Sequence, residues 1–134
     1  MTVGALNNGF SKDTKLDCSS GLQVGNRWFK NYESAAYGPI DFARALELSC
    51  DTFFYRVGLS FWTKYGSDPT DVKARDPLIA VAKDFGFGSD TGIDLPAEAS
   101  GRIADRRWKQ KYWEMLKPRY CKMAAEKNAP RDYL

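Results

Sequence analysis

The 134-residue sequence contains no histidine and only three cysteines, which are Cys18, Cys50 and Cys121. Without histidine, the chain cannot carry out Ser-His-Asp or Cys-His catalysis by itself. The cysteines show no C-x-x-C spacing, so we expect no structural zinc site, and nothing else predicts a metal or a cofactor. At most one disulfide can form within the chain. The sequence leaves open which pair would form it and whether it forms.

Long hydrophobic runs are also absent. No apolar stretch approaches the about 20 residues that a membrane-spanning helix requires, and Met1 is not followed by a signal-peptide pattern. If the natural protein is secreted or anchored, we expect its targeting element outside these residues. A hydrophobic content of 43% and a charged content of 28% are ordinary for a soluble globular domain. The length suits one modest domain.

The net charge of +3 is unevenly distributed. Residues 1–101 carry 10 basic and 13 acidic side chains, whereas residues 102–134 carry 10 basic and 4 acidic ones. A basic end of this kind can bind nucleic acid or anionic lipid, but it is more often a solvated helical face. Because it lacks any recognised nucleic-acid-binding signature beyond charge, we do not expect nucleic acid as a partner.

Three segments have the apolar spacing and the end signals of helices. Asp41 and Asp76 suit N-cap positions, Pro77 suits a first helical position, and Gly86 suits a left-handed stop. The predicted helices run from Asp41 to Leu48 or Ser49, from Thr52 to Trp62, and from Pro77 to Phe85. The middle helix carries one apolar stripe, which predicts a core face rather than a ligand site: Phe53, Phe54, Val57 and Phe61.

Weaker patterns flank these helices. Residues 2–6 are expected to be the end of a helix, and short extended pieces are expected at 22–24 and 28–29 around the Gly25-Asn26 turn signal. Residues 66–75 are typical of a surface loop, and Thr91 to Pro96 predicts a turn followed by a short extended piece. A weaker helix is expected at 105–116, with a short helix after Pro118 around 120–126. The predicted division is a loop-rich connector at 1–38, a motif-bearing helical core at 39–101, and a basic C-terminal segment at 102–134.

A small polar triplet, Ser49-Cys50-Asp51, lies between two of the helix-patterned segments. Such polar groups either satisfy helix ends or serve a site. Pattern alone favours a capped helix break. The residues further along the chain favour a site.

Two blocks, in this order, carry a family resemblance. The first runs from Ala45 to Tyr55 and contains the polar triplet. The second contains F-G-F-G at 85–88, T-G-I-D-L-P at 91–96, E-A-S-G at 98–101 and W-K at 108–109. Over roughly residues 35–110, the pair resembles the transpeptidase domain of class B penicillin-binding proteins, specifically the elongation-type penicillin-binding protein 2 group.

The resemblance implies a serine acyltransferase with three motifs in chain order: S-x-x-K, S-x-N and K-[ST]-G. The first serine attacks the D-alanyl-D-alanine carbonyl of a peptidoglycan stem peptide, and the acyl group passes to the amine of a neighbouring peptide. Penicillins acylate the same serine. Implied partners are stem peptides, β-lactams and cell-wall elongation proteins. The implied location is the extracytoplasmic face of a bacterial cytoplasmic membrane, with any anchor outside this chain.

The triplet matches the middle motif of this family. By this match Ser49 is catalytic, because a hydroxyl that both donates and accepts can pass a proton between the two lysines. Asp51 is substrate-binding and stands where asparagine is usual, so it keeps acceptor oxygens but lacks the donor NH₂. An ionised Asp51 beside a lysine would favour the ammonium form and weaken that lysine as a base. Cys50, the variable middle position, is expected to pack rather than react.

The other two motifs are missing from these residues. No serine has lysine three positions later, and no lysine is followed by Ser-Gly or Thr-Gly; Lys64-Tyr65-Gly66 comes closest. We therefore expect the helical middle of a transpeptidase domain, which neither turns over substrate nor reacts with penicillin by itself. Two alternatives stay open at this point: a non-enzymatic helical binding module with a basic tail, and an inactive relative that serves as a scaffold in cell-wall assembly.

The expected fold of this chain is mainly α-helical with minor short strands. The family's α/β architecture, which is shared with serine β-lactamases, has a central sheet built from segments outside these residues. Helices that lack that sheet lose a packing partner, so we expect some apolar surface to be exposed.

Overall fold

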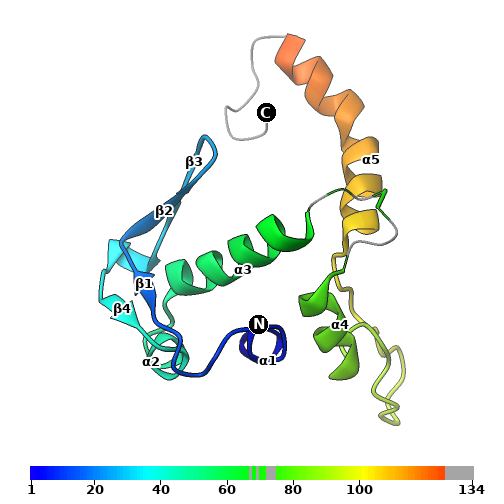
Figure 1. The fold of residues 1–134 in the computed structure, drawn as a ribbon. Helices are drawn as coiled ribbons and strands as arrows, with labels where there is room; N and C mark the ends of the chain where they lie inside the picture. Colours follow the sequence, from blue (N-terminus) through cyan, green and yellow to red (C-terminus); the bar gives the residue numbers. More distant parts are fainter. Residues whose placement is uncertain (67, 69, 72–74, 126–134) are drawn as a thin grey trace.

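The computed structural model describes residues 1–66, 68, 70–71 and 75–125. The chain is mainly helical with short strands, as expected, and α3 lies between the strands on one side and α4 and α5 on the other (Figure 1). The elements in chain order are α1 (Thr2–Leu6), β1 (Leu16–Cys18), β2 (Gly21–Val24), β3 (Arg27–Lys30), the 3₁₀ turn η1 (Tyr32–Ser34), β4 (Gly38–Ile40), α2 (Phe42–Glu47), α3 (Asp51–Tyr65), α4 (Pro77–Asp84) and α5 (Arg106–Ala125).

The four strands form two antiparallel pairs. β2 and β3 make a hairpin in which Val24 lies opposite Arg27, and Gly25 takes the positive φ of 59° that its two-residue turn requires. A side chain at Gly21 would collide with the ring of Trp28 on the facing strand. β1 pairs with β4, with Leu16 opposite Ile40. The extended pieces predicted around the Gly25-Asn26 turn are therefore confirmed.

The three helices with clear end signals are confirmed, and α3 is longer than expected by one residue at its start and three at its end. The Asp41 carboxylate accepts a hydrogen bond from the Arg44 amide at 2.9 Å and caps α2. Asp76 caps α4 in the same way, accepting from the Ile79 amide at 3.3 Å. Gly86 adopts a φ of 84° directly after α4. The predicted loop at 66–75 lies partly outside the described residues.

Two expectations beyond residue 90 are wrong. The helix that was expected to end before Pro118 continues through it as a single α5 up to Ala125. Proline removes one hydrogen bond but does not have to end a helix, and the stacked rings of Trp113 and Tyr120 contact each other across it, 6.2 Å apart. In the other case, residues 91–96 form no strand. The Leu95 amide instead bonds to the Ile93 carbonyl at 2.8 Å in a tight turn.

The core is built around α3. Phe53 is fully buried and makes edge-to-face contacts with Phe42, whose ring centre is 4.9 Å away, and with Phe54 at 5.3 Å. The predicted stripe faces this core, with Phe54 only partly buried. The buried hydrophobic residues are Ala5, Cys18, Leu22, Ile40, Phe42, Ala45, Cys50, Phe53, Val57 and Phe61. All of them precede residue 62.

Apolar surface is exposed, as the sequence predicts. Among the described residues after residue 80, the most exposed large hydrophobic side chains are Phe85, Phe87, Leu95 and Met115, each between 63% and 67% accessible. Among the residues that the structure describes, none of the helices has both the length and the hydropathy needed to cross a membrane.

Candidate functional site

The turn between α2 and α3 carries the candidate residues. Two backbone hydrogen bonds close it: the Ser49 amide donates to the Leu46 carbonyl at 3.2 Å, and the Cys50 amide donates to the Ala45 carbonyl at 2.9 Å. This is the Schellman arrangement, in which the residue after the C-cap is left-handed and is usually glycine. Here that residue is Ser49, with a φ of 50°. A side chain at this position carries a conformational penalty that a purely structural turn would avoid by using glycine.

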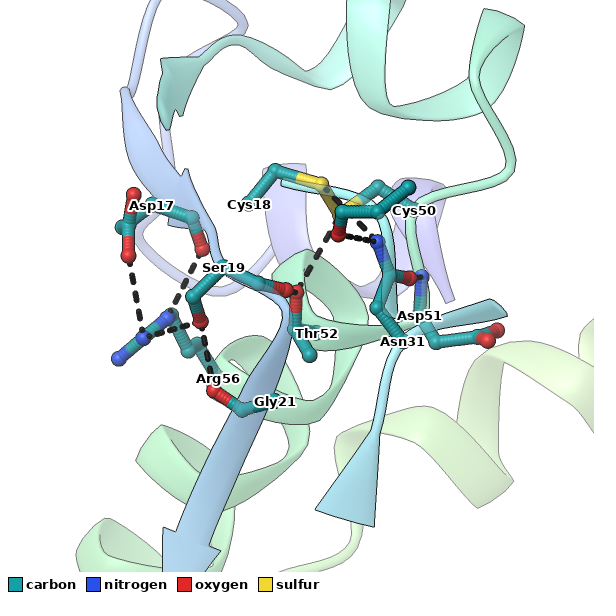
Figure 2. Close-up of a disulfide and its surroundings, with 10 residues drawn as sticks. Asp17, Cys18, Ser19, Gly21, Asn31, Cys50, Asp51, Thr52 and Arg56 are labelled. Carbon is teal, nitrogen blue, oxygen red and sulfur yellow. Dashed lines mark hydrogen bonds and ion pairs between the residues drawn. A yellow bond between two sulfur atoms is a disulfide. The ribbon is translucent and has the colours of Figure 1, made fainter. Parts of the chain in front are cut away.

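The polar side chains of the turn do not cap the following helix. Cys50 holds the N-cap position of α3 and provides no side-chain cap. Ser49 is exposed, and neither its hydroxyl nor the Asp51 carboxylate makes a hydrogen bond to any residue that the structure describes. In Figure 2 the Asp51 carboxylate points away from the disulfide. The simple capping interpretation therefore fails, and both groups remain available to another molecule. A carboxylate in the first turn of α3 is also favourable next to the helix dipole.

Cys50, at the centre of the turn, forms a disulfide with Cys18 (Figure 2). The bond joins the end of β1 to the start of α3 over 32 positions of sequence, with the two Cα atoms 6.2 Å apart. Both cysteines are almost completely buried, which confirms that Cys50 packs. Cys121 is free and exposed. The sequence could not select this pair, because the contact depends on how β1 packs against α3.

Asn31, between β3 and η1, contacts the candidate turn, which the sequence did not indicate. Its Oδ1 accepts a hydrogen bond from the Asp51 amide at 3.0 Å, and its Nδ2 donates to the Ala35 carbonyl at 2.7 Å. The same Nδ2 lies 3.6 Å from the Sγ of Cys18. An asparagine in a loop carries no local signal that its partner is 20 residues away.

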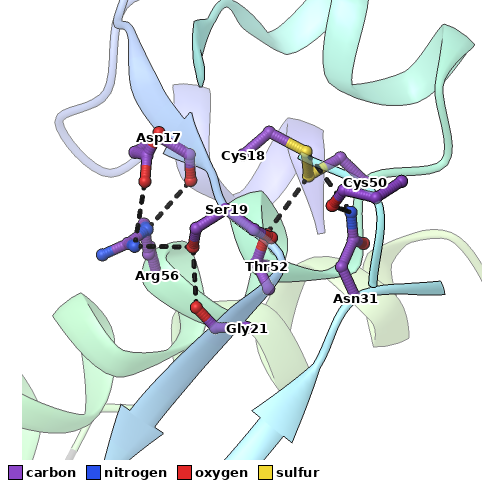
Figure 3. Close-up of polar contacts among 9 residues, drawn as sticks. Asp17, Cys18, Ser19, Gly21, Asn31, Cys50, Thr52 and Arg56 are labelled. Carbon is purple, nitrogen blue, oxygen red and sulfur yellow. Dashed lines mark hydrogen bonds and ion pairs between the residues drawn. A yellow bond between two sulfur atoms is a disulfide. The ribbon is translucent and has the colours of Figure 1, made fainter. Parts of the chain in front are cut away.

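A second set of polar contacts fastens β1 to α3 (Figure 3). The buried Thr52 hydroxyl donates to the Ser19 carbonyl at 2.8 Å. One turn further along α3, the Arg56 Nε donates to the Asp17 carbonyl at 2.9 Å, and its Nη2 donates to the Ser19 hydroxyl at 3.0 Å. Because these bonds use backbone carbonyls next to Cys18, they align the strand with the helix on both sides of the disulfide.

The second sequence block is not brought to this turn. Figure 1 places the segment after α4 beyond the C-terminal end of α3, whereas the Ser49 turn is at the N-terminal end. Within that segment, the partly exposed Glu98 carboxylate accepts from the Thr91 amide at 2.7 Å and from the Thr91 hydroxyl at 2.6 Å. These bonds lower the pKa of Glu98 below its ordinary value. The described residues contain no group of three histidine, cysteine or carboxylate side chains that could hold a metal ion.

Curated relatives match most of this chain. It is 35% identical over 123 residues to the peptidoglycan D,D-transpeptidase MrdA of Escherichia coli K12, and this match covers 90% of the chain and 17% of the relative. The MrdA protein of Haemophilus influenzae is 33% identical over 93 residues, which is 69% of the chain and 12% of the relative. The chain therefore spans less than a fifth of the length of these relatives.

Solved structures and a family model agree with the relatives. Penicillin-binding protein 2 in its complex with MreC from Helicobacter pylori superposes with a TM-score of 0.69 at 25% identity, covering 84% of this chain and 19% of that one. A chain of a peptidoglycan synthase complex superposes with a TM-score of 0.64 at 27% identity, covering 83% and 18% respectively. The model of the penicillin binding protein transpeptidase domain matches residues 1–117. The chain therefore belongs to the penicillin-binding protein transpeptidase family.

Proposed function

We propose that this chain is a segment of a peptidoglycan D,D-transpeptidase in which Ser49 relays a proton and Asp51 binds the substrate. The observation that carries the proposal is the conformation of Ser49. An exposed serine without a hydrogen-bond partner among the described residues occupies a left-handed position that suits glycine, in a chain of this family. A hydroxyl at this position serves no structural contact of the turn, so retaining it is best explained by chemistry outside the segment.

The proposed reaction is acyl transfer through a serine acyl-enzyme. In the whole protein the nucleophile and the two lysines come from the S-x-x-K and K-[ST]-G motifs. The Ser49 hydroxyl donates to one lysine while accepting from the other, which lets a proton pass between them. Asp51 offers two acceptor oxygens to the backbone N–H groups of a stem peptide. Its negative charge favours the ammonium form of a nearby lysine, so it tunes that lysine as well as binding substrate.

The partners and location follow from the proposed reaction. Substrates are peptidoglycan stem peptides, and β-lactams are acylating inhibitors. Cell-wall elongation proteins are the proposed protein partners, which is supported by a related structure in complex with MreC. The proposed site of action is the extracytoplasmic face of the bacterial cytoplasmic membrane. The division into a connector at 1–38, a helical core at 39–101 and a basic segment at 102–134 stays a prediction.

A fluorescent penicillin tests the assignment of the reaction. The 134-residue chain should show no covalent label, because it contains no S-x-x-K serine. A longer product of the same gene that contains S-x-x-K upstream and K-[ST]-G downstream should be labelled. Labelling of the 134-residue chain would contradict the motif assignment. A longer product without S-x-x-K would instead favour a scaffold without transpeptidase activity.

Replacing Ser49 by glycine in that longer protein separates chemistry from folding. Glycine suits a φ of 50°, so Ser49→Gly should leave the stability unchanged or raise it by about 1 kcal/mol. The acylation rate should nevertheless fall about 100-fold, the scale of a lost proton-transfer group. Ser49→Ala should lose the same activity without the gain in stability. Acylation at the wild-type rate in both variants would remove Ser49 from the proton relay.

A further inference from the structure

The start of α3 lacks a cap of its own. The first amide groups of a helix have no partner inside the helix, and a side chain at the N-cap position normally satisfies one of them. Cys50 holds that position, and its sulfur is committed to the disulfide. Asn31 supplies the missing acceptor from a different part of the chain, through the bond from the Asp51 amide to its Oδ1. The helix that carries Asp51 is therefore capped from outside.

The Asn31 side chain is held in one orientation. It is 5% exposed, its Oδ1 faces an N–H donor, and its Nδ2 faces a carbonyl acceptor. If the two ends of the amide were exchanged, its Nδ2 would face the Asp51 N–H and its Oδ1 would face the Ala35 carbonyl. The first contact would join two donors and the second two acceptors, so the network permits only one orientation. The second hydrogen of Nδ2 is directed at the Cys18 sulfur. Every polar group of this side chain is therefore in use, and none is available to a substrate.

The backbone around Asn31 is arranged to present that amide. The Asn31 amide donates to the Ser20 carbonyl at 2.9 Å, and its carbonyl accepts from the Ser34 amide at 3.0 Å. Two non-glycine residues in the following turn, Glu33 and Ser34, have positive φ values of 49° and 56°. This tight reversal brings the Ala35 carbonyl back to the Nδ2 of Asn31. Strained backbone of this kind persists only where surrounding contacts determine it.

The disulfide fixes the turn from its other side. Cys50 is covalently joined to β1, and Thr52 and Arg56 bond to the backbone on either side of Cys18. The central residue of the triplet is therefore tethered to β1, while the side chains of Ser49 and Asp51 make no hydrogen bond to a described residue. Asn31 contacts both components, the sulfur on one side and the Asp51 amide on the other. The two tethers hold the turn together as one unit.

We infer that Asn31 is a positioning residue for the Ser49-Cys50-Asp51 turn, acting with the Cys18–Cys50 disulfide. It touches no reacting atom. Its role is to set the direction of the first turn of α3, and with it the places of the Ser49 hydroxyl and the Asp51 carboxylate. The inference rests on the function proposed above for those two groups. Small displacements of catalytic groups lower reaction rates strongly, so this role has a measurable kinetic consequence.

The first test uses amide hydrogen exchange in the 134-residue chain. Asn31→Ala removes the partner of the Asp51 amide, whose exchange should then accelerate about tenfold. Asn31→Asp keeps an acceptor oxygen for the Asp51 amide but turns its second oxygen toward the Ala35 carbonyl, so protection of the Asp51 amide should be only partly retained. Val57→Ala is the matched control, because it opens the buried core of α3 without touching the turn. The exchange rate of the Asp51 amide is corrected in each variant for the loss of global stability. If the corrected rates in Asn31→Ala and Val57→Ala are equal, the inference is overturned.

The second test uses the longer gene product with its nucleophile. Asn31→Ala should lower the first-order rate constant of penicillin acylation about tenfold, with little change in the dissociation constant of the non-covalent complex. Asn31→Asp should restore part of the rate, to the extent that it restores protection of the Asp51 amide. Val57→Ala, assayed below its unfolding temperature, should leave the acylation constant unchanged. A rate constant unaffected by Asn31→Ala would contradict the positioning role, as would a loss that Val57→Ala reproduces.

The disulfide is tested in the same assay with a dithiol reductant. Two electrons and two protons pass from the dithiol to the Cys18–Cys50 bond, giving two thiols and an oxidised reagent. Acylation should slow after reduction and recover after reoxidation, and Cys121→Ser should behave like the wild type throughout. Unchanged acylation in the reduced protein would remove the disulfide from the inference. If the oxidised wild-type protein is not acylated at all, the proposed function fails instead, and the exchange test of Asn31 stands separately.

Discussion

The chain has two regions that are built in different ways. Residues 1–66 contain all the strands, the disulfide and the buried hydrophobic residues named above. From residue 75 to residue 125 the structure has two helices, joined by a segment that contains several glycines. Among these described residues only Pro77 is buried. The first region is held by contacts between distant parts of the sequence. The second buries little, and it is tied to distant residues through Leu78, which packs against the core, and Arg106, which donates to the Tyr65 and Arg75 carbonyls.

The two regions therefore differ in what stabilises them: hydrophobic burial in the first, and mainly caps and short-range hydrogen bonds in the second. Hydrophobic burial supplies most of the free energy of folding, whereas caps and short-range hydrogen bonds contribute about 1 kcal/mol each. Proteins open locally where few buried contacts must break. The Ser49 turn lies in the well-packed region, which suits a site whose groups must keep fixed positions. The segment around Thr91 and Glu98 lies where opening requires little free energy.

The largest expected effect is the loss of a core ring. Phe53→Ala removes a fully buried side chain that contacts Phe42 and Phe54, so the free energy of unfolding should fall by about 3–5 kcal/mol. The matched change in the second region is Phe87→Ala, at a side chain that is 67% exposed. It should change the free energy by no more than about 0.5 kcal/mol. Urea denaturation followed by circular dichroism measures both, and equal losses would refute the contrast between the regions.

An intermediate effect comes from two caps of the same chemistry. Asp41→Ala should lower the free energy of unfolding by about 1 kcal/mol, because α2 places Phe42 and Ala45 in the core. Asp76→Ala removes an equivalent cap from α4, and its main effect should be faster amide exchange within α4. Asn replacements at both positions keep an acceptor oxygen and serve as controls. If Asp76→Ala lowers global stability as much as Asp41→Ala, α4 belongs to the same cooperative unit as the core.

These two caps also show what the sequence can predict. The start of each of these helices is marked by an N-cap carboxylate, a nearby proline and a helical spacing of apolar residues. These signals lie within a few residues of one another, so the starts of α2 and α4 could be predicted without knowing the fold. The same applies to the turn at Gly25 and the stop at Gly86. The family resemblance was carried by equally local motifs, and it predicts the roles of Ser49 and Asp51. Each of these signals depends on neighbours in the chain.

Two features that escaped prediction depend on tertiary contacts. The partner of Cys50 is set by the packing of β1 on α3, and the role of Asn31 is set by a turn that reverses the chain toward Ala35. The prediction that a helix ends before Pro118 failed for a different reason. Proline is a reliable signal of a lost hydrogen bond, but whether a helix ends or bends there depends on contacts such as that between Trp113 and Tyr120.

The smallest expected effect is a pH response in the second region. Hydrogen bonds from the Thr91 hydroxyl and amide lower the pKa of Glu98 from its ordinary value of 4.5. A carboxyl whose pKa is lower in the folded state stabilises its contact above the unfolded pKa, and the contact is lost as the pH falls through the folded pKa. The amide resonance of Thr91 should therefore titrate with a midpoint below 4.5.

Because the Glu98 carboxylate accepts its hydrogen bonds from Thr91 in the same loop, its protonation should open only the segment around it. Exchange protection in α3 should stay constant across that transition, since among the described residues no hydrogen bond or ring contact joins Thr91 or Glu98 to α3. Glu98→Gln keeps an acceptor oxygen but cannot titrate, so the pH response of the Thr91 amide should disappear while its chemical shift at neutral pH stays close to that of the wild type. A Thr91 midpoint at or above the ordinary glutamate value would show that the hydrogen bonds to Glu98 do not persist in solution. A simultaneous loss of protection in α3 would show that the two regions unfold together, and the contrast between them would then be one of packing but not of stability.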